Sequence, residues 1–579
     1  MPEAPAPVSE SPASDAAFAL LESFARLGVL DVVVCPGSRS QALALAAAAL
    51  ADDGVLRLHV RLDERGAGFL ALGLAIETGV PALVVTTSGT AVANLHPAVL
   101  EAHHSRVPFV VLSADRPVEL RGIRANQTTV QPGMFGGATR LEADVEAPAG
   151  AADVVAVSSL AARAIAAATD SANPGPVHLN LQYREPLSSG GPRSATATPD
   201  APPPDAGSGG GEASDATTAA DAASDALALS HGPRTVVIAG HGAGEQAEAA
   251  ARAGGWPLLA EVSSGARFGP QLVVSYRELL ADEDFGGRIE RAVVFGHPTL
   301  SREVPALLMS EGVETIVVNP TAAEGYDPGH SAVFASTVSI ESHEQTTDER
   351  RWTGRWVTTS RALRDAATEA AADSLVPLGS GVDARREFLK VELAAVKKPV
   401  DRRMLVEALW NATWPHDRLM FGASRLIRDA DRVVPGKRIR VHSNRGLAGI
   451  DGTVATALGI AVASQAAGAP GITRVLLGDL TLLHDAGSLL IGNGEVRPRV
   501  LIVVGNDGGG TIFDTLEVAA SAPRDAFDRV LYTPQAADLS ALAAAYGWEY
   551  RRAENQGRLT DALTAPVTGP TILEVPLPR

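Results

Sequence analysis

The sequence of 579 residues lacks the usual features of secreted and membrane proteins. It contains a single cysteine, Cys35, so no disulfide can form within the chain, which is typical of a reducing compartment. The first residues, MPEAPAPVSESPAS, have neither the basic start nor the apolar stretch of a signal peptide. No run approaches the roughly 20 apolar residues that a membrane-spanning helix needs. These absences predict a cytoplasmic protein without a membrane span.

Positive charge is also in short supply. The chain has 49 Lys and Arg residues against 67 Asp and Glu residues, a formal net charge of −18. Such a balance disfavours general binding to nucleic acids or anionic membranes. An acidic protein that binds anionic small molecules must therefore gather its arginines locally. The length exceeds what one hydrophobic core can serve and predicts about three domains.

Strand, glycine- or serine-containing turn and helix recur along the chain, which predicts α/β domains with parallel sheets flanked by helices. Most of the predicted strands are short apolar runs that suit burial on both faces of a sheet. The main ones are 32–35, 56–60, 82–87 and 109–112 in the N-terminal third, 235–239, 292–295 and 315–318 in the central third, and 418–422, 440–442, 475–477, 500–504 and 571–575 in the C-terminal third.

Residues 188–230 consist mostly of Gly, Pro, Ala, Ser, Asp and Thr and are predicted to form a flexible linker. The glycine-rich turn 240–244 that follows the first central strand lacks the GxGxxG spacing, and no convincing ribose-binding carboxylate comes about 20 residues later. We therefore expect a tight turn in a spacer domain here, and no nucleotide site.

Two apolar runs near the C-terminus are each followed at once by small and acidic or amide residues. Asp479 follows the first run, and Asn506, Asp507 and Gly508 follow the second. Ligands of open α/β sheets bind beyond the carboxyl ends of the strands, where these residues would lie side by side. A carboxylate, an amide oxygen and a glycine carbonyl can hold a small hard cation and leave positions for phosphate oxygens. Two ordinary turns with polar caps are the alternative interpretation.

Glu64 and a set of arginines are the other candidates for chemistry. Glu64 follows a predicted strand and precedes two glycines and a helix predicted over 69–76, although on local sequence alone a surface pair with Arg65 is the favoured interpretation. Ser38 is expected to cap the helix 41–50 and to favour an anion there. Arginine binds carboxylates through its planar fork, so arginines placed after strands could form a carboxylate trap. These arginines are Arg39, Arg116, Arg428 and Arg445.

Several motifs occur in a fixed order from Cys35 to Gly510: CPGSRS, DERGAGF, TSGTAVANLHPAVLEA, SADRP, ANQ, SNRGLAGIDG, GDL and NDGGG. On these motifs the chain resembles the 2-succinyl-5-enolpyruvyl-6-hydroxy-3-cyclohexene-1-carboxylate synthase family, the thiamine-diphosphate enzymes of menaquinone biosynthesis. TSGTAVAN, SADRP and SNRG followed by GIDG distinguish it from relatives similar to acetolactate synthase. The chain departs from the general GDG…NN motif of thiamine-diphosphate enzymes, because Leu480 replaces a glycine and Gly505 replaces an asparagine.

The resemblance implies a thiamine-diphosphate-binding fold with two catalytic domains around a spacer domain. The expected limits are 1–187 for a pyrimidine-binding domain, 188–230 for the linker, 231–373 for the spacer and 374–579 for a diphosphate- and Mg²⁺-binding domain. The implied cofactors are thiamine diphosphate and Mg²⁺ or Mn²⁺. The implied reaction is decarboxylation of 2-oxoglutarate and 1,4-addition of the succinyl carbanion equivalent to isochorismate, in a homodimer or homotetramer with sites at subunit interfaces.

The resemblance also assigns roles to residues. Glu64 would hydrogen-bond the pyrimidine of the cofactor, and Ile450 would bend the cofactor. The expected metal ligands are Asp479, Asn506 and the carbonyl of Gly508, with Asp507 as a competing ligand. The expected catalytic residues are Glu64, Arg39, Arg428 and Arg445. Expected cofactor contacts come from Glu64, Ser88, Gly89, Ile450, Gly478, Asp479, Leu480, Asn506, Ile512 and Phe513, and expected substrate contacts from Ser38, Arg39, Arg116, Asn126, Gln127, Ser424, Arg428 and Arg445.

Three alternatives stay open at the level of sequence. Another thiamine-diphosphate enzyme, either a 2-oxoacid decarboxylase or an acetolactate synthase, would keep the same cofactor motifs. A non-catalytic binding protein could keep the fold, although retention of both Glu64 and Asp479 argues against it. A nucleotide-dependent oxidoreductase is the most distant alternative, because no complete dinucleotide-binding motif occurs in the chain.

Overall fold

The computed structural model describes residues 10–150, 152–188, 226–321, 324–371, 385, 386, 390, 394 and 396–579. These residues form two compact units. The first unit holds the described residues up to 188 together with Gly446–Ala469 and His484–Pro498, and the second holds those from 226 to Arg445 with Pro470–Leu483 and Arg499–Arg579. Residues 189–225 of the predicted linker, and the predicted boundary at 373, lie outside the described residues.

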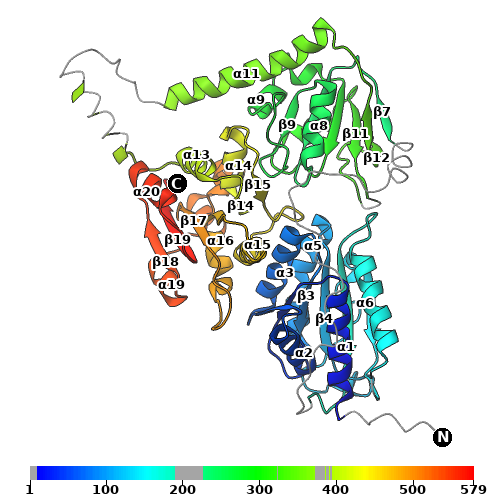
Figure 1. Cartoon of the computed structure of the whole chain (residues 1–579). Helices are drawn as coiled ribbons and strands as arrows, with labels where there is room; N and C mark the ends of the chain where they lie inside the picture. Colours follow the sequence, from blue (N-terminus) through cyan, green and yellow to red (C-terminus); the bar gives the residue numbers. More distant parts are fainter. Residues whose placement is uncertain are drawn as a thin grey trace. The chain divides into compact units, whose positions relative to one another are not determined.

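A six-stranded sheet with the order β2-β1-β3-β4-β6-β5 forms the core of the first unit (Figure 1). All its strands are parallel. Helices α1 (Pro12–Arg26), α2 (Gln41–Asp52) and α6 (Val154–Ala168) share one apolar core with these strands. The strands are β1 (Asp31–Val34), β2 (Arg57–Val60), β3 (Ala82–Thr86), β4 (Phe109–Asp115), β5 (Leu141–Val145) and β6 (Pro176–Gln182).

Helix α3 (Glu64–Thr78) begins earlier than the sequence predicts, because Asp63 caps it and Glu64 is its first residue. Its glycines do not break the helix but allow close packing against α15 (Thr453–Ala466), which belongs to the same unit. A Cβ atom on Gly73 would lie 2.1 Å from the carbonyl oxygen of Thr456. Helix-to-helix contact at this distance requires glycine.

The second unit contains two further parallel sheets and a short two-stranded one. The central sheet has the order β12-β11-β10-β8-β9, the last sheet has the order β15-β14-β16-β17-β19-β18, and β13 pairs with β7. The central strands are β7 (Leu227–Leu229), β8 (Thr235–Ala239), β9 (Leu258–Ala260), β10 (Arg291–Phe295), β11 (Glu314–Val318), β12 (Val333–Ala335) and β13 (Val338–Ile340). The last sheet consists of β14 (Arg418–Phe421), β15 (Arg440–His442), β16 (Thr473–Gly478), β17 (Val500–Asn506), β18 (Glu549–Arg552) and β19 (Thr571–Pro576).

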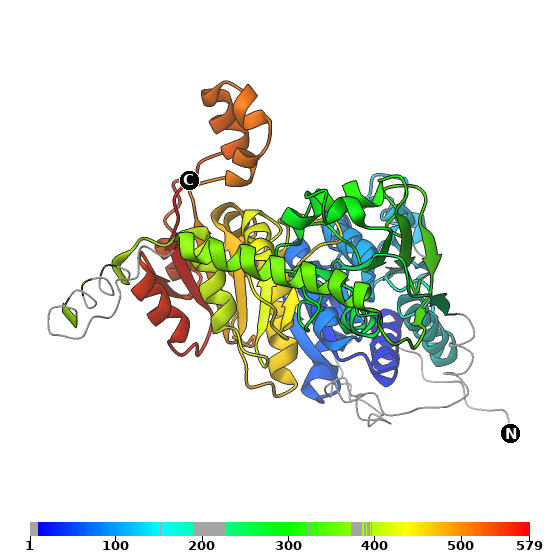
Figure 2. The same cartoon turned by 90° about the horizontal axis from the view of Figure 1, so that it is seen from above.

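Helices cover these two sheets. The longest is α11 (Thr347–Ala371), the long light-green helix of Figure 2, whose Trp356 is fully buried in the core of the central sheet. The others that matter below are α8 (Glu245–Gly254), α9 (Tyr276–Leu280), α13 (Arg402–Ala412), α14 (Arg425–Val433) and α16 (Asp479–His484). No helix of the described ranges is long and apolar enough to span a bilayer.

The predicted α/β class with parallel sheets is therefore confirmed. Each large sheet lies within one of the three predicted domains, and the domain limits themselves stay predictions. Seven strands were not predicted. Strand β6 carries buried polar side chains that hide its apolar pattern. The other six are short or half-exposed, namely β5, β7, β9, β12, β13 and β18. The hydroxyl of Ser113 lies 2.7 Å from Nε2 of His178 and donates to Oδ1 of Asn180 at 2.9 Å, so hydrogen bonds between neighbouring strands link these buried side chains.

Candidate active site

The last sheet brings the predicted metal ligands to one edge. Strands β16 and β17 pair in parallel with Gly478 opposite Gly505, so Asp479 and Asn506 leave the sheet side by side. The side chain of Asp479 is buried, and burial together with the charge of Asp507 raises the pKa of Asp479 to about 6. Two carboxylates close together in a buried place oppose ionisation unless a cation compensates them.

The neighbours of these side chains fix their orientation. The amide nitrogen of Asn506 donates to Glu574 at 2.9 Å, so its oxygen faces the other way, where it accepts from the N–H of Gly508 at 3.2 Å. The Oδ2 atom of Asp507 already accepts two hydrogen bonds, one from Arg402 at 2.7 Å and one from the hydroxyl of Thr511 at 2.5 Å.

The glycine-rich turn after β17 leaves no room for side chains. Gly508 has a φ of 78°, and a Cβ atom there would lie 2.9 Å from the hydroxyl oxygen of Tyr532. That hydroxyl donates to the carbonyl of Asp507 at 2.9 Å and closes the turn. The substitution of asparagine by Gly505 also has a packing reason, since a Cβ atom would meet Leu426 at 2.8 Å.

These donors fit a divalent cation. The edge offers a buried carboxylate of raised pKa, an oriented amide oxygen and the backbone carbonyl of Gly508, all of which are hard oxygen donors. The remaining predicted cofactor contacts in this unit, Gly478, Leu480, Ile512 and Phe513, are half-buried.

In the first unit, Glu64 is half-buried at the amino end of α3 and accepts from the amide of Asn94 at 3.2 Å. Arg65 does not pair with it. The guanidinium of Arg65 donates to the carbonyl of His484 at 2.9 Å and lies 3.7 Å from Asp451, so the alternative of a surface pair is not supported. Burial and the nearby charges of Glu64 and Asp63 raise the pKa of the Cys35 thiol well above its usual value.

Ile450 is half-buried in a loop of the first unit that is tied at both ends. At its start, the carboxylate of Glu101 accepts from the backbone N–H groups of Gly446 and Leu447 at 2.7 and 2.9 Å. At its end, Asp485 accepts from two N–H groups in the first turn of α15, at 2.8 and 3.1 Å. Sequence reasoning missed both carboxylates, because they lie far along the chain from the loop that they hold.

The predicted residues at the ends of β3 and β4 come together in the first unit. Arg116 donates to the hydroxyl of Ser88 and, at 3.0 Å, to the carbonyl of Gln127. The amide of Gln127 donates back to the carbonyl of Ser88 at 3.0 Å. Gly89, with a φ of 87°, donates its N–H to Gln131 at 3.0 Å.

Arg39 belongs to the same group. Burial of Arg116 lowers its pKa, and the nearby positive charge of Arg39 lowers it further. Its backbone N–H donates to the hydroxyl of Thr87 at 3.3 Å. The prediction that Ser38 caps α2 is wrong: Ser40 is the N-cap residue, and Ser38 is exposed because the turn extends two residues further. The side chain of Asn126 is also exposed.

Arg445 and Arg428 lie in the second unit. Arg445 is 2% exposed, and its guanidinium donates to the hydroxyl and the carbonyl of Thr299 at 2.9 and 3.2 Å. Thr299 in turn donates its N–H to Glu261 at 2.7 Å. Burial and the nearby Asp431 raise the pKa of Glu261 to about 8. Arg428 is half-buried and donates to the carbonyl of Ser424 at 2.9 Å, as expected for their helical spacing.

The fully buried Asp431 of α14 is a further feature that the sequence did not reveal. It accepts from Tyr276 and from Arg277, each at 2.6 Å, and lies 3.5 Å from Arg267. These partners all come from the region of the central sheet. No local motif marks such a network, because Asp431 lies more than 150 residues along the chain from both Tyr276 and Arg277.

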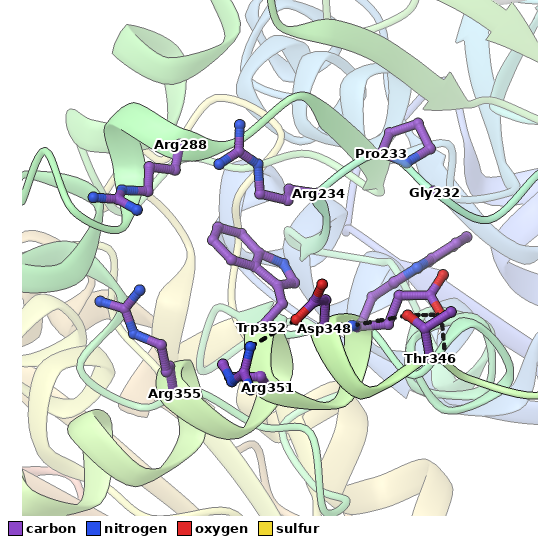
Figure 3. A pocket seen from close by; sticks show the side chains of 11 residues that line it. Gly232, Pro233, Arg234, Arg288, Thr346, Asp348, Arg351, Trp352 and Arg355 are labelled. Carbon is purple, nitrogen blue, oxygen red and sulfur yellow. Dashed lines mark hydrogen bonds and ion pairs between the residues drawn. The ribbon is translucent and has the colours of Figure 1, made fainter.

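A cavity of about 450 Å³ lies at the start of β8 and α11 (Figure 3). Its arginines are largely neutralised: Arg234 pairs with Glu290 at 2.7 Å, Arg288 with Asp284 at 2.5 Å and Arg351 with Asp348 at 2.6 Å. It lies at the amino end of β8, whereas α/β sheets bind ligands at the carboxyl ends of their strands. We therefore do not assign the active site to this cavity.

Comparison with known proteins agrees with this geometry. Residues 14–136 match the family model of the thiamine pyrophosphate enzyme N-terminal TPP binding domain. Proteins named 2-succinyl-5-enolpyruvyl-6-hydroxy-3-cyclohexene-1-carboxylate synthase from Leifsonia xyli subsp. xyli and Clavibacter michiganensis subsp. michiganensis are each 57% identical, covering 99% and 100% of this chain and 98% of each relative. A protein of the same name from Kineococcus radiotolerans is 44% identical over 98% of this chain and 96% of its own length.

The fold and the matched domain define a thiamine-diphosphate-dependent enzyme. Within that class, identity over nearly the whole length of several relatives decides the family. The chain belongs to the 2-succinyl-5-enolpyruvyl-6-hydroxy-3-cyclohexene-1-carboxylate synthase family.

Proposed function

We propose that this chain decarboxylates 2-oxoglutarate and transfers the resulting succinyl unit to isochorismate in a 1,4-addition, a step of menaquinone biosynthesis in the cytoplasm. The observation that carries the proposal is the 57% identity to synthases of that name over essentially the full length of both chains. When bound, thiamine diphosphate supplies the carbon nucleophile and the electron sink that the decarboxylation needs.

Asp479, the amide oxygen of Asn506 and the carbonyl of Gly508 would hold Mg²⁺ or Mn²⁺ beside the diphosphate. The raised pKa of Asp479 supports this role, because a bound cation would relieve the repulsion from Asp507. The contacts of Asp507 with Arg402 and Thr511 favour Asn506 as the second ligand.

Glu64 would hydrogen-bond the N1′ atom of the cofactor pyrimidine and give or accept the proton there. Its place at the first turn of α3 fixes the carboxylate, and Asn94 restrains one of its oxygens. Ile450 would support the bent cofactor. The contacts of Glu101 and Asp485 at either end of its loop support this role, because a bending residue must be rigid. Ser88 and Gly89 would contact the same cofactor.

Both substrates are dicarboxylates, and arginines would bind them. Arg445 is held in place by Thr299, and Arg39 and Arg116 lie close enough together to repel each other, which a bound carboxylate would relieve. The proposed substrate-side residues are Ser38, Arg39, Arg116, Asn126, Gln127, Ser424, Arg428 and Arg445, and Arg39, Arg428 and Arg445 would also assist the reaction.

Glu64 lies in the first unit, and the proposed cation ligands lie in the second. We propose that the active form is a homodimer, or a tetramer built from dimers, in which Glu64 of one chain and Asp479 of another serve the same cofactor. Two equivalent sites per dimer would follow from the two-fold symmetry.

The direct test is to incubate the protein with thiamine diphosphate, Mg²⁺, 2-oxoglutarate and isochorismate and to identify the product by mass. We expect the mass of the succinyl adduct and an equal amount of CO₂, and neither when isochorismate is replaced by chorismate. Turnover of pyruvate to acetolactate with no adduct would instead support the acetolactate synthase alternative.

A further inference from the structure

A second group of possible metal ligands lies in the central part of the second unit, apart from the proposed active site. His231, His343 and Glu349 offer ligand atoms that all lie within 4.8 Å of one another. Nε2 of His343 lies 3.2 Å from Oε2 of Glu349, and Nδ1 of His231 lies 3.8 Å from Oε1 of the same carboxylate. Glu349 also borders the cavity of Figure 3.

His231 presents a bare ring nitrogen to this group. Its Nε2 lies 2.9 Å from the backbone carbonyl of Glu341, which can only accept, so Nε2 carries a proton. Nδ1, the nitrogen left for a ligand, is buried without a hydrogen-bond partner among the described residues. The side chain is only 8% exposed, which shields that nitrogen from water. A carbonyl that holds one ring nitrogen while the other stays free is the usual support of a metal-binding histidine.

Glu349 is fixed in place independently of the two histidines. Thr346 and Glu349 form a capping box at the start of α11: the N–H of Thr346 donates to Oε2 of Glu349 at 2.7 Å, and the N–H of Glu349 donates to the hydroxyl of Thr346 at 3.3 Å. The Oε1 atom of Glu349 is left facing Nδ1 of His231.

The spacing of the atoms fits a tetrahedral ion. Ligands at 2.0–2.1 Å from zinc in a tetrahedral arrangement are about 3.3 Å apart. Nε2 of His343 lies 3.2 Å from Oε2 of Glu349, close to that value, and one ligand atom from each of the three residues lies within 4.8 Å of the other two. Nδ1 of His231 lies 3.8 Å from the other carboxylate oxygen, Oε1, which exceeds hydrogen-bonding distance.

We propose that His231, His343 and Glu349 bind a zinc ion, with water as the fourth ligand. Two imidazoles and one carboxylate suit zinc, whereas the oxygen donors around Asp479 suit magnesium, so the two sites would select different ions. The ion would join the segment before β8, the segment after β13 and the first turn of α11. The first of these parts lies more than 100 residues before the other two, which are close together along the chain, so we infer that the ion stabilises the central sheet and takes no part in the reaction.

The test uses the full-length protein without a polyhistidine tag. The protein is stripped with a chelator, dialysed against zinc in the presence of thiamine diphosphate and excess Mg²⁺, which occupy the proposed active site, and analysed for zinc per chain. We expect one bound zinc for the wild type. We expect at least about 100-fold weaker binding for His343→Ala and for Glu349→Gln, since loss of a ligand costs no less than loss of a residue that only supports one.

His330→Asn is the matched control. It removes an exposed imidazole of the same region whose φ of 53° asparagine tolerates, and it should retain zinc. Zinc should raise the melting temperature of the wild type and of the control but not of His343→Ala. Cobalt substituted for zinc should give the visible absorption of a four-coordinate ion.

A wild type that binds no zinc under these conditions, or a His343→Ala protein that binds it equally well, would overturn the proposal. Turnover by the zinc-free protein is expected to persist, so failure of this proposal and failure of the proposed function are distinguishable.

Discussion

The central sheet and the last sheet of the second unit both place a glycine-rich turn after a buried strand, yet the two turns differ in what they leave open. In the central sheet, a Cβ atom on Gly240 would lie 2.1 Å from the backbone nitrogen of Pro298. His241 and His297 exchange backbone hydrogen bonds of 2.9 and 2.8 Å across the turn. Burial lowers the pKa of His241 to about 3, so its ring stays neutral. This turn is closed by its own backbone.

The edge of the last sheet is different, because its carboxylates are not fully neutralised. Arg402 pairs with Asp507, but Asp479 still feels the charge of Asp507 and has a raised pKa. A glycine-rich turn after a strand is therefore not sufficient to form a ligand site. What distinguishes the two edges is the set of oxygen donors that follows the strands, and each prediction below changes one part of that difference.

The largest effect is expected from Glu64→Gln. An amide can still hydrogen-bond the cofactor but cannot exchange a proton with it, so kcat should fall by about 10²–10⁴-fold. Calorimetry should show nearly unchanged affinity for thiamine diphosphate. Turnover close to that of the wild type would remove Glu64 from its proposed role.

Removal of the buried Asp479 carboxylate of the last sheet should weaken binding of the metal ion and of the cofactor. Asp479→Ala is expected to weaken Mg²⁺ and thiamine diphosphate together by at least about 100-fold, because the ion would bridge protein and diphosphate. The matched change at the central edge is Glu261→Gln, which replaces a carboxyl whose pKa burial raises to about 8 with a neutral amide. Glu261→Gln should leave the affinity for thiamine diphosphate unchanged. An equal loss of affinity in both variants would contradict the distinction between the central sheet and the last sheet.

The raised pKa of Asp479 predicts a pH dependence of metal binding. Mg²⁺ needs the ionised carboxylate, so its affinity should be full above about pH 7 and should fall about tenfold per pH unit below 6. The stability of the metal-free protein should respond in the opposite sense. Its folded state binds a proton more readily than the unfolded chain, whose pKa is near 3.8, so this carboxyl opposes folding above pH 6 and ceases to do so as the pH falls. Asp479→Asn should abolish both responses in calorimetric titrations and thermal melts.

The smallest effect is expected from a pair of glycine substitutions. Gly508→Ala and Gly242→Ala each place a side chain at a positive φ, 78° and 74°, and each should cost about 1 kcal/mol of stability. Only Gly508→Ala should also weaken cofactor binding, since its Cβ atom would press on Tyr532, whereas a Cβ atom on Gly242 meets nothing within 4 Å. Equal cofactor affinities in the two variants would contradict the assignment of the turn at Gly508.

The sequence predicted those features of the fold and of the site that depend on local sequence pattern and on the geometry of parallel strands. Apolar runs marked most of the strands, and the rule that ligands gather at carboxyl ends placed Asp479 beside Asn506, as the register confirms. Contacts that depend on distant partners could not be predicted. Glu101 accepts a hydrogen bond from the N–H of Gly446, and Asp431 accepts one from Arg277. No periodicity in the sequence links the members of either pair.

The start of α3 was misplaced for a related reason. Glycines usually weaken helices, and Gly66 and Gly68 therefore suggested a loop after Glu64. In the structure they are buried within the helix, where the absence of a side chain allows close packing: a Cβ atom on Gly68 would lie 2.7 Å from that of Ala98. Packing against another helix overrides local propensity at these positions.

The central claim, that Glu64 and Asp479 act on one cofactor and come from different chains, is tested most directly by mixing two inactive variants. Glu64→Gln and Asp479→Ala proteins are combined under conditions in which labelled subunits are shown to exchange, and adduct formation is measured. A mixed dimer would carry both lesions in one site and none in the other, so activity should return, up to one intact site per mixed dimer. If subunits exchange and no activity returns, the shared-site account is contradicted and each chain must build its own site.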